Sequence, residues 1–171
     1  MAKPSPSALP YRPCVGIMVV NRAGLVWIGH RANVATDAEG SGSWWQMPQG
    51  GIDQTEDPRL AALRELAEET GMSSVEVIGE SRDWHTYDLP SHLVGVAWKG
   101  RYRGQRQKWF AMRFLGPDGE IDIGREGPGH HIEFDAWRWA PVNEVLSLIV
   151  PFKRDVYAAV LSELGPLARP E

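Results

Sequence analysis

Hydrophobic and polar residues alternate along this chain with two periods, which predicts a domain that combines strands and helices. An apolar run at residues 14–20 ends in the polar turn at residues 21–24, and a second apolar run covers residues 25–29. Two short apolar runs around a glycine-containing turn are typical of a β-hairpin. Five further segments have the composition of strands, at residues 75–78, 84–87, 93–98, 108–115 and 136–139.

One segment, between Asp57 and Gly71, has the signals of an α-helix at both ends. Asp57 suits the N-cap, Pro58 suits the first turn, and Gly71 suits the C-terminal end. At 3.6 residues per turn, one side of this helix is apolar and the opposite side is acidic. The apolar side is predicted to contain Leu60, Leu63, Leu66 and Ala67, and the acidic side Glu65, Glu68 and Glu69.

The order of the predicted elements indicates the fold class. Strands dominate, one helix comes early, and two helices are expected near the end, at residues 143–148 and 153–164. This order predicts an α+β domain or a layered α/β/α domain. We expect a flexible N-terminal tail at residues 1–10, one domain at residues 11–165, and a C-terminal tail at residues 166–171.

Length and charge narrow the classes of function. The 171 residues have the size of one domain, and 18 Lys and Arg against 22 Asp and Glu give a net charge of −4. Proteins that coat nucleic acid are usually basic, and this chain is not, so we expect no DNA binding. If the protein acts on RNA, we expect it to hold the RNA locally, at one end. Cys14 is the only cysteine, which excludes an internal disulfide. With no signal-like or membrane-spanning apolar run, we expect a cytoplasmic protein without membrane contact, and favour a monomer.

The three glutamates on the acidic side carry the candidate chemistry. Glu65 lies one helical turn from both Glu68 and Glu69, and like charges at this spacing repel each other. Carboxylate oxygens are the ligands that Mg²⁺ prefers, and cations among them would remove the repulsion. Two or more such ions would polarise a phosphate and lower the pKa of a bound water. The alternative is a solvated acidic helix face, which is common on protein surfaces.

The surrounding residues match a longer pattern. Gly50 is followed by five residues, Glu56, seven residues and then the run from Arg64 to Met72. This segment resembles the Nudix box, in which an Arg-Glu pair, two further glutamates and a glycine are fixed. The resemblance implies an α/β/α sandwich with a mixed β-sheet, and hydrolysis of nucleoside diphosphates linked to another group. It also implies that Mg²⁺ (or Mn²⁺, or Zn²⁺) is held by Glu65, Glu68, Glu69 and Gly50, with Glu56 and Arg64 organising the loop.

Segments outside this box resemble two groups within the family. They lie at residues 11–13, 45–49, 107–110, 133–139 and 152–157. Together they are similar to the RNA pyrophosphohydrolases and to the diadenosine polyphosphate hydrolases. Trp44 and a long loop at residues 32–43 are closer to the second group.

The same resemblance implies roles for residues far from the box. Glu133 would complete the metal site. Three cations would contact phosphates or the first bases of RNA, or else be solvated or salt-bridged at the surface, namely Arg12, Arg31 and Lys153. Lys108 would reach a polyphosphate or lie along the edge of the core. Tyr87 and Phe152 would stack on a base or pack in the core. A basic stretch with Arg101, Tyr102, Arg103 and Arg106 is either an attraction site for RNA or a solvated hairpin tip.

Three functions follow from these residues. The first is a pyrophosphohydrolase that acts on the 5′-triphosphate end of RNA and starts messenger decay. The alternative is asymmetric hydrolysis of a dinucleoside polyphosphate, with diadenosine tetraphosphate giving ATP and AMP. A third is a non-catalytic nucleotide-binding module, which would not need the acidic residues that this chain retains.

Overall fold

A mixed β-sheet lies at the centre of the computed structural model, which describes residues 5–32, 43–124 and 132–171. The strands are β1 (Tyr11–Val20), β2 (Val26–Arg31), β3 (Trp45–Gln46), β4 (Gln49–Gly51), β5 (Val75–Glu80), β6 (His85–Asp88), β7 (Gly104–Phe114) and β8 (Phe134–Ala140). The α-helices are α1 (Pro58–Thr70), α2 (Val142–Leu148) and α3 (Arg154–Leu164). Short 3₁₀ helices are η1 (Pro6–Ala8), η2 (Ala97–Gly100), η3 (Asp118–Glu120), η4 (Pro151–Lys153) and η5 (Gly165–Leu167).

The sheet is built around one parallel pair of strands. β1 and β7 run side by side from the pair Tyr11 and Gly104 to the pair Val20 and Arg113. All other strand pairs among the described residues are antiparallel. The central order is β3-β2-β1-β7-β5, and β4, β6 and β8 pair with β1, β7 and β2. The predicted hairpin is confirmed as β1 and β2, and the predicted mixed sheet is confirmed with it.

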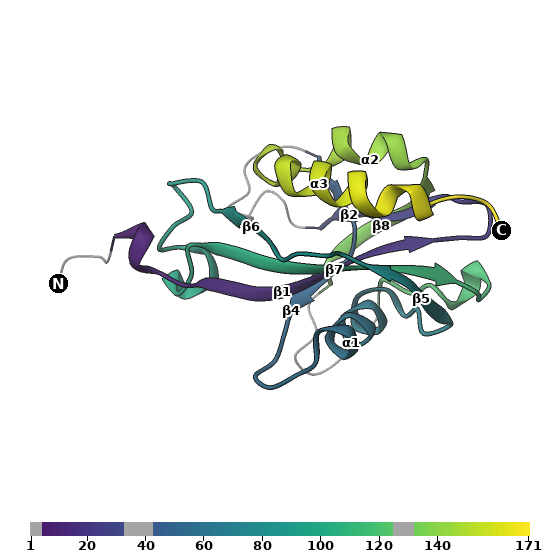
Figure 1. The fold of residues 1–171 in the computed structure, drawn as a ribbon, viewed down its shortest axis with the longest axis horizontal. Helices are drawn as coiled ribbons and strands as arrows, with labels where there is room; N and C mark the ends of the chain where they lie inside the picture. Colours follow the sequence, from purple (N-terminus) through teal and green to yellow (C-terminus); the bar gives the residue numbers. More distant parts are fainter. Residues whose placement is uncertain (1–4, 33–42, 125–131) are drawn as a thin grey trace.

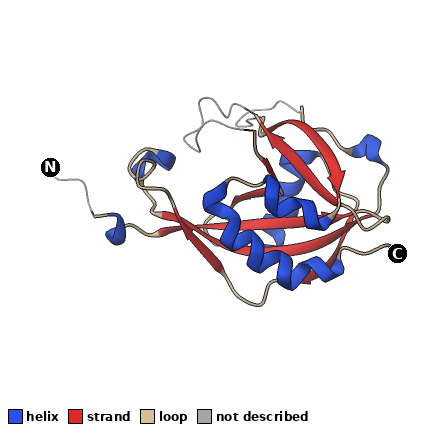
Figure 2. Ribbon diagram, turned by 90° about the horizontal axis from the view of Figure 1, so that it is seen from above, coloured by secondary structure: helices blue, strands red, loops and turns tan. Residues whose placement is uncertain are grey.

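Helices cover both faces of this sheet. Figure 1 shows α1 on one side and α2 with α3 on the other, and Figure 2 shows the latter pair lying across the strands. β1 explains why both faces are covered, because its side chains alternate between two buried clusters. Val15, Ile17 and Val19 pack with residues of α1, whereas Met18 and Val20 pack with residues of α2 and α3. The α/β/α sandwich is therefore confirmed.

Helix α1 has the predicted ends but a different buried face. The Asp57 side chain accepts a hydrogen bond from the Leu60 backbone, and Gly71 ends the helix with a φ of 76°. The buried face is formed by Ala61, Ala62, Leu66 and Thr70. Leu60 is 60% exposed, so its predicted place on the apolar side was wrong. The small alanines face the sheet instead, which rotates Leu60 towards solvent.

The strand predicted at residues 93–98 does not form. This region contains turns and η2, although the side chain of Leu93 is buried as a strand residue would be. Gly95 and Gly100 have positive φ values of 88° and 73°, and Trp98 and Lys99 are also left-handed. Left-handed residues reverse the chain direction locally, so an extended strand cannot continue through them.

The two ends of the chain differ in their contacts. Before β1, η1 is the only helix or strand in the described part of the chain. At the other end, Leu167 and Ala168 pack against the cluster below α2 and α3, and the Arg113 side chain donates to the Arg169 carbonyl at 3.0 Å. Most of the predicted loop at residues 32–43 lies outside the described residues. In the parts of the chain that the structure describes, no helix has the length and apolar character needed to cross a membrane.

Candidate active site

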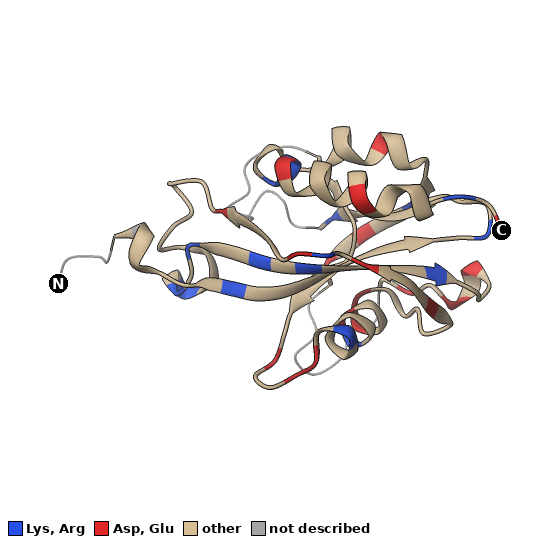
Figure 3. Cartoon of the chain, in the orientation of Figure 1, with Lys and Arg blue, Asp and Glu red and all other residues tan. Residues whose placement is uncertain are grey.

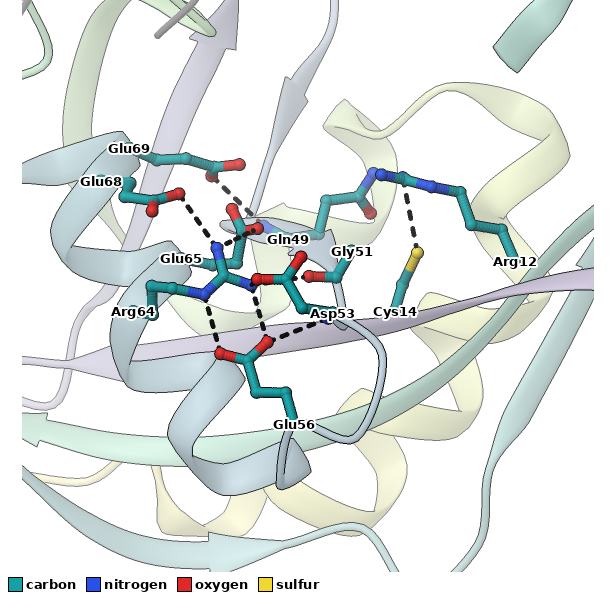
Figure 4. Close-up of polar contacts among 10 residues, drawn as sticks. All are labelled: Arg12, Cys14, Gln49, Gly51, Asp53, Glu56, Arg64, Glu65, Glu68 and Glu69. Atoms are coloured by element: carbon teal, nitrogen blue, oxygen red, sulfur yellow. Dashed lines mark hydrogen bonds and ion pairs between the residues drawn. The ribbon is translucent and has the colours of Figure 1, made fainter. Parts of the chain in front are cut away.

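Strand β4 and helix α1 bring the glycine loop against the acidic face of the helix. Figure 4 shows the side chains of Glu65, Glu68 and Glu69 leaving the helix towards the segment that carries Gln49 and Gly51. Gly50 lies directly over Glu65, because a Cβ built on Gly50 would be 2.0 Å from the Glu65 carboxyl carbon. Only glycine therefore allows this approach, which explains its position in the sequence pattern.

Arg64 connects the loop to the helix. Its Nε and Nη2 donate to the two carboxylate oxygens of Glu56 at 2.8 and 2.9 Å, and Nη2 also donates to the Gly51 carbonyl at 2.9 Å. Its Nη1 donates to Glu65 at 3.0 Å and to Glu68 at 3.1 Å. A bidentate arginine–carboxylate contact pairs the two charges and also fixes the relative orientation of the two groups. Hydrogen bonds from Arg64 and from the Asp53 backbone lower the pKa of Glu56 to about 2.

Glu65 and Glu69 differ from Glu56, because their pKa values are raised rather than lowered. Burial raises the pKa of Glu65 to about 7, and the neighbouring Arg64 only partly opposes this effect. Burial also raises the pKa of Glu69 well above its usual value, and the charges of Glu133 and Glu65 raise it further. Glu69 accepts a hydrogen bond from the Gln49 backbone at 3.3 Å. Carboxylates crowded in this way favour the binding of a cation.

Glu133 reaches this cluster from a distant part of the chain. It precedes β8, and its backbone carbonyl accepts a hydrogen bond from the Ala32 backbone at the end of β2. Its charge is close enough to raise the pKa of Glu69, whereas the charge of Arg31 lowers it. The sheet thus brings Glu133 and Arg31 to the end of the acidic helix face.

The donor set fits a hard divalent cation. Its oxygens are carboxylates, two of the carboxylates have raised pKa values, and Arg64 Nη1 already places a positive charge between Glu65 and Glu68. Among the described residues, no three His, Cys, Asp or Glu side chains are arranged as a complete metal site. The carboxylates instead accept hydrogen bonds from Arg64 and from the Gln49 backbone.

Arg12 lies beside the glycine loop on the other side from Glu65. A Cβ on Gly51 would be 2.5 Å from Arg12 Nη2, and Arg12 lies over the Trp98 ring at 5.6 Å from its centroid. Arg12 Nη1 also approaches the sulfur of Cys14 at 3.6 Å. The predicted phosphate-binding cations Arg12 and Arg31 therefore both lie near the acidic cluster.

The other predicted substrate residues are mostly engaged within the fold. Lys108 donates to the backbone carbonyls of Ser81 and Arg82 at the end of β5. Tyr87 is 8% exposed and belongs to a buried cluster, and Phe152 packs against that cluster at 5.7 Å from Tyr87. Lys153 is 2% exposed and lies 5.9 Å from the Tyr87 ring centroid. This arrangement favours the core-packing interpretation of Tyr87.

Sequence reasoning missed a row of buried amide side chains. Gln107 donates to Gln49 at 3.2 Å and to Gln105 at 2.7 Å, and it accepts from the Trp109 indole at 3.0 Å. This row ties β7 to β4, the strand whose Gln49 backbone donates to Glu69. The alternation of Gln105 and Gln107 with charged residues in a strand was the available signal.

Comparisons with known proteins agree with this geometry. The NUDIX domain profile matches residues 10–160. The chain is 58% identical over 164 residues to the RNA pyrophosphohydrolase of Brucella ovis, covering 95% of this chain and 92% of the relative. It is 57% identical over 162 residues to the RNA pyrophosphohydrolase of Rhizobium meliloti, covering 94% and 97%.

Solved structures agree at the level of the fold. A C. elegans Ap4A hydrolase complex superposes with a TM-score of 0.62 at 14% identity, covering 91% of this chain and 98% of the other. The MutT protein of Methanosarcina mazei Go1 superposes with a TM-score of 0.63 at 16% identity, covering 91% and 96%. With its glycine loop, its Arg64-centred network and its acidic helix face all in register, the chain belongs to the Nudix family.

Proposed function

We propose that this protein is an RNA pyrophosphohydrolase that acts on the 5′-triphosphate end of RNA. The observation that carries the proposal is the identity of 57–58% over nearly the whole chain to curated relatives of that name. The acidic cluster around Glu65 and Glu69, with Arg12 and Arg31 beside it, supports a site for an anionic polyphosphate. Removal of pyrophosphate would start the decay of a messenger RNA.

The reaction is hydrolysis of a phosphoanhydride bond. Water adds its oxygen to phosphorus, the anhydride P–O bond breaks, and the products are 5′-monophosphate RNA and pyrophosphate, or successive phosphates. Glu65, Glu68, Glu69 and Glu133 would hold Mg²⁺ or Mn²⁺ ions beside the Gly50 loop. When bound, such ions supply positive charge to the phosphates and make water a better nucleophile at neutral pH.

The protein's own residues position these groups. Arg64 and Glu56 fix the glycine loop against α1, which holds the acidic side chains in one orientation. Arg12 and Arg31 place guanidinium groups beside the acidic cluster, and such groups suit bidentate contact with phosphate oxygens. Carboxylates that are protonated in the free protein must release their protons when a cation binds.

The substrate is tested by comparing kcat/KM on 5′-triphosphate RNA with kcat/KM on diadenosine tetraphosphate, both in Mg²⁺. We expect the RNA to be preferred, and Glu69→Gln to abolish both activities as a control for contaminating enzymes. A preference of several hundredfold for the dinucleotide would overturn the proposal in favour of a dinucleoside polyphosphate hydrolase. Binding of both compounds without turnover would indicate a non-catalytic module.

A further inference from the structure

The segment that joins β6 to β7 and the start of β7 are basic in a protein that is acidic overall. Residues 89–103 contain three Lys and Arg and no Asp or Glu, and residues 104–108 add two more cations, whereas the whole chain has a net charge of −4. Figure 3 shows Lys and Arg gathered on the half of the sheet nearer the N-terminus, away from the acidic residues of α1 and α3. The local charge is positive although the overall charge is negative, which indicates that this region has a role of its own.

Aromatic rings lie among these cations in the loop at residues 89–103. Trp98 and Tyr102 pack edge to face with 6.2 Å between their centroids, and both rings are partly exposed. Lys99 and Arg101 lie between these two residues in the sequence and are exposed. Arg103, by contrast, is held by Asp88 at 2.8 Å. Exposed cations beside partly exposed rings are the combination that binds single-stranded nucleic acid.

The loop is held in one shape by its glycines and by Leu93. A Cβ on Gly100 would be 3.0 Å from the Gly95 carbonyl oxygen, so the two ends of this turn are in close contact. Leu93 is 3% exposed and anchors the loop in the cluster beneath α2 and α3. A preformed surface loses less conformational freedom when it binds a ligand.

Arg12 connects this loop to the glycine loop at Gly50 and Gly51. One side of its guanidinium group lies against Gly51 of the glycine loop, and the group also lies over the Trp98 ring. A chain that leaves the acidic cluster past Arg12 therefore meets Trp98 first and Tyr102 next. A dinucleoside polyphosphate has two bases and no chain beyond them, whereas RNA continues.

We propose that Trp98, Lys99, Arg101 and Tyr102 form a platform for the RNA chain that follows the 5′-terminal nucleotides. Bases stack on the two rings, and the two exposed cations contact the phosphates between them. This inference rests on the proposed function, because it assigns a site to the part of the substrate that is not cleaved. It explains how a protein of net negative charge holds RNA at one end.

The first test compares two lengths of the same substrate. In the wild-type enzyme, kcat/KM should be higher for a 5′-triphosphate RNA of 12 nucleotides than for one of 2 nucleotides. A paired change, Lys99→Gln with Arg101→Gln, should lower the value for the 12-mer by about tenfold, within the range of one stacking or charge contact. The same enzyme should keep its activity on the 2-mer, and its slope of log kcat/KM against log salt should fall by about 1.4.

A second variant and a matched control separate stacking from general charge effects. Tyr102→Ala should lower activity on the 12-mer alone, with an unchanged melting temperature. Arg106→Gln is the control, because Arg106 is an exposed cation that lies 4.3 Å from a tryptophan ring, that of Trp84. Arg106 follows the buried Gln105 in β7, so the side chains of these two residues lie on opposite faces of the strand. This control should leave both RNA lengths unaffected.

Three results would overturn the platform. They are equal kcat/KM for both lengths in the wild type, equal losses on both lengths in the loop variants, or an equal loss in Arg106→Gln. A failure of the proposed function is distinguished by binding a fluorescent 5′-hydroxyl RNA 12-mer in EDTA, where no hydrolysis occurs. Weaker binding by the loop variants than by Arg106→Gln supports the platform even if another phosphate compound is cleaved faster, and equal binding overturns it.

Discussion

The two ends of the segment from Gly50 to Met72 carry glutamates in opposite electrostatic states. At the loop end, Glu56 receives two hydrogen bonds from Arg64, and its pKa falls to about 2. At the helix end, burial raises the pKa of Glu65 to about 7 and that of Glu69 well above its usual value. Arg64 keeps Glu56 ionised, whereas its contact with Glu65 only partly offsets the effect of burial, and Glu69 is buried beside two further carboxylates. A divalent cation has its strongest reason to bind there.

The largest expected effect comes from removing charge at the helix end. Glu69→Gln should lower kcat by about 100-fold or more, because a proposed metal ligand is lost. Glu68→Gln should act in the same direction. The melting temperature in EDTA should stay constant or rise, since a buried carboxylate among like charges is removed. Near-normal hydrolysis by both variants would be incompatible with the metal assignment.

Weakening the loop end should have the next largest effect. Arg64→Lys keeps the positive charge but loses the paired contact with Glu56 and the reach to Gly51. We expect kcat to fall about 10- to 100-fold, as for other residues that orient metal ligands. The melting temperature should fall too, unlike in Glu69→Gln. If Arg64→Lys retained full activity, the network would have no role in positioning.

A glycine pair tests the close contact between loop and helix. Gly50→Ala should lower kcat about tenfold, because the new Cβ would have to displace the Glu65 carboxyl group. Gly119→Ala is the control, since no atom lies within 4 Å of a Cβ at that position. Steady-state kinetics and melting curves of both variants give the comparison. Equal effects would mean that the approach of Gly50 to Glu65 has no catalytic importance.

The smallest expected effect is a pair of opposite pH dependences in EDTA. The Glu56 pKa is lowered from 4.5, so the unfolded state binds more protons and the stabilisation is lost as pH falls from 4.5 to about 2. The Glu65 pKa is raised, so the folded state binds more protons and stability is lost as pH rises from 4.5 to about 7.

Urea unfolding as a function of pH measures both effects. Glu56→Gln should be less stable than the wild type at pH 6 and equally stable near pH 2. Glu65→Gln should be more stable than the wild type above pH 7 and equally stable below pH 4.5. The same sign of change in both variants at pH 7 would remove the contrast between the two ends.

Much of the frame was predictable because its signals are local. The ends of α1 follow from Asp57, Pro58 and Gly71, and the structure has all three in the expected roles. The hairpin of β1 and β2 follows from two apolar runs around one turn. Leu60 was misplaced because helical periodicity gives a set of possible faces, whereas packing of two alanines against the sheet selects one.

Features that depend on distant residues were harder to predict. The turns at residues 93–98 have the composition of a strand, and a strand is excluded by the positive φ values of Gly95, Trp98, Lys99 and Gly100. The nearness of Glu133 to Glu69 depends on how β8 pairs with β2, which no local pattern specifies. Lys108 could be placed on its strand, but its backbone partners at Ser81 and Arg82 could not be foreseen.

The parallel pair of β1 and β7 has a consequence for how the chain folds during synthesis. β1 can pair with β7 only after residues 104–113 have left the ribosome, so the centre of the sheet closes about 90 residues after β1 has been synthesised. Contacts of such large sequence separation form slowly. Until then, the apolar run of β1 lacks the strand that will cover one edge, although the residues of α1 have already been synthesised. Substitutions that add charge within β1 are therefore expected to change the yield of folded protein more than the rate of catalysis.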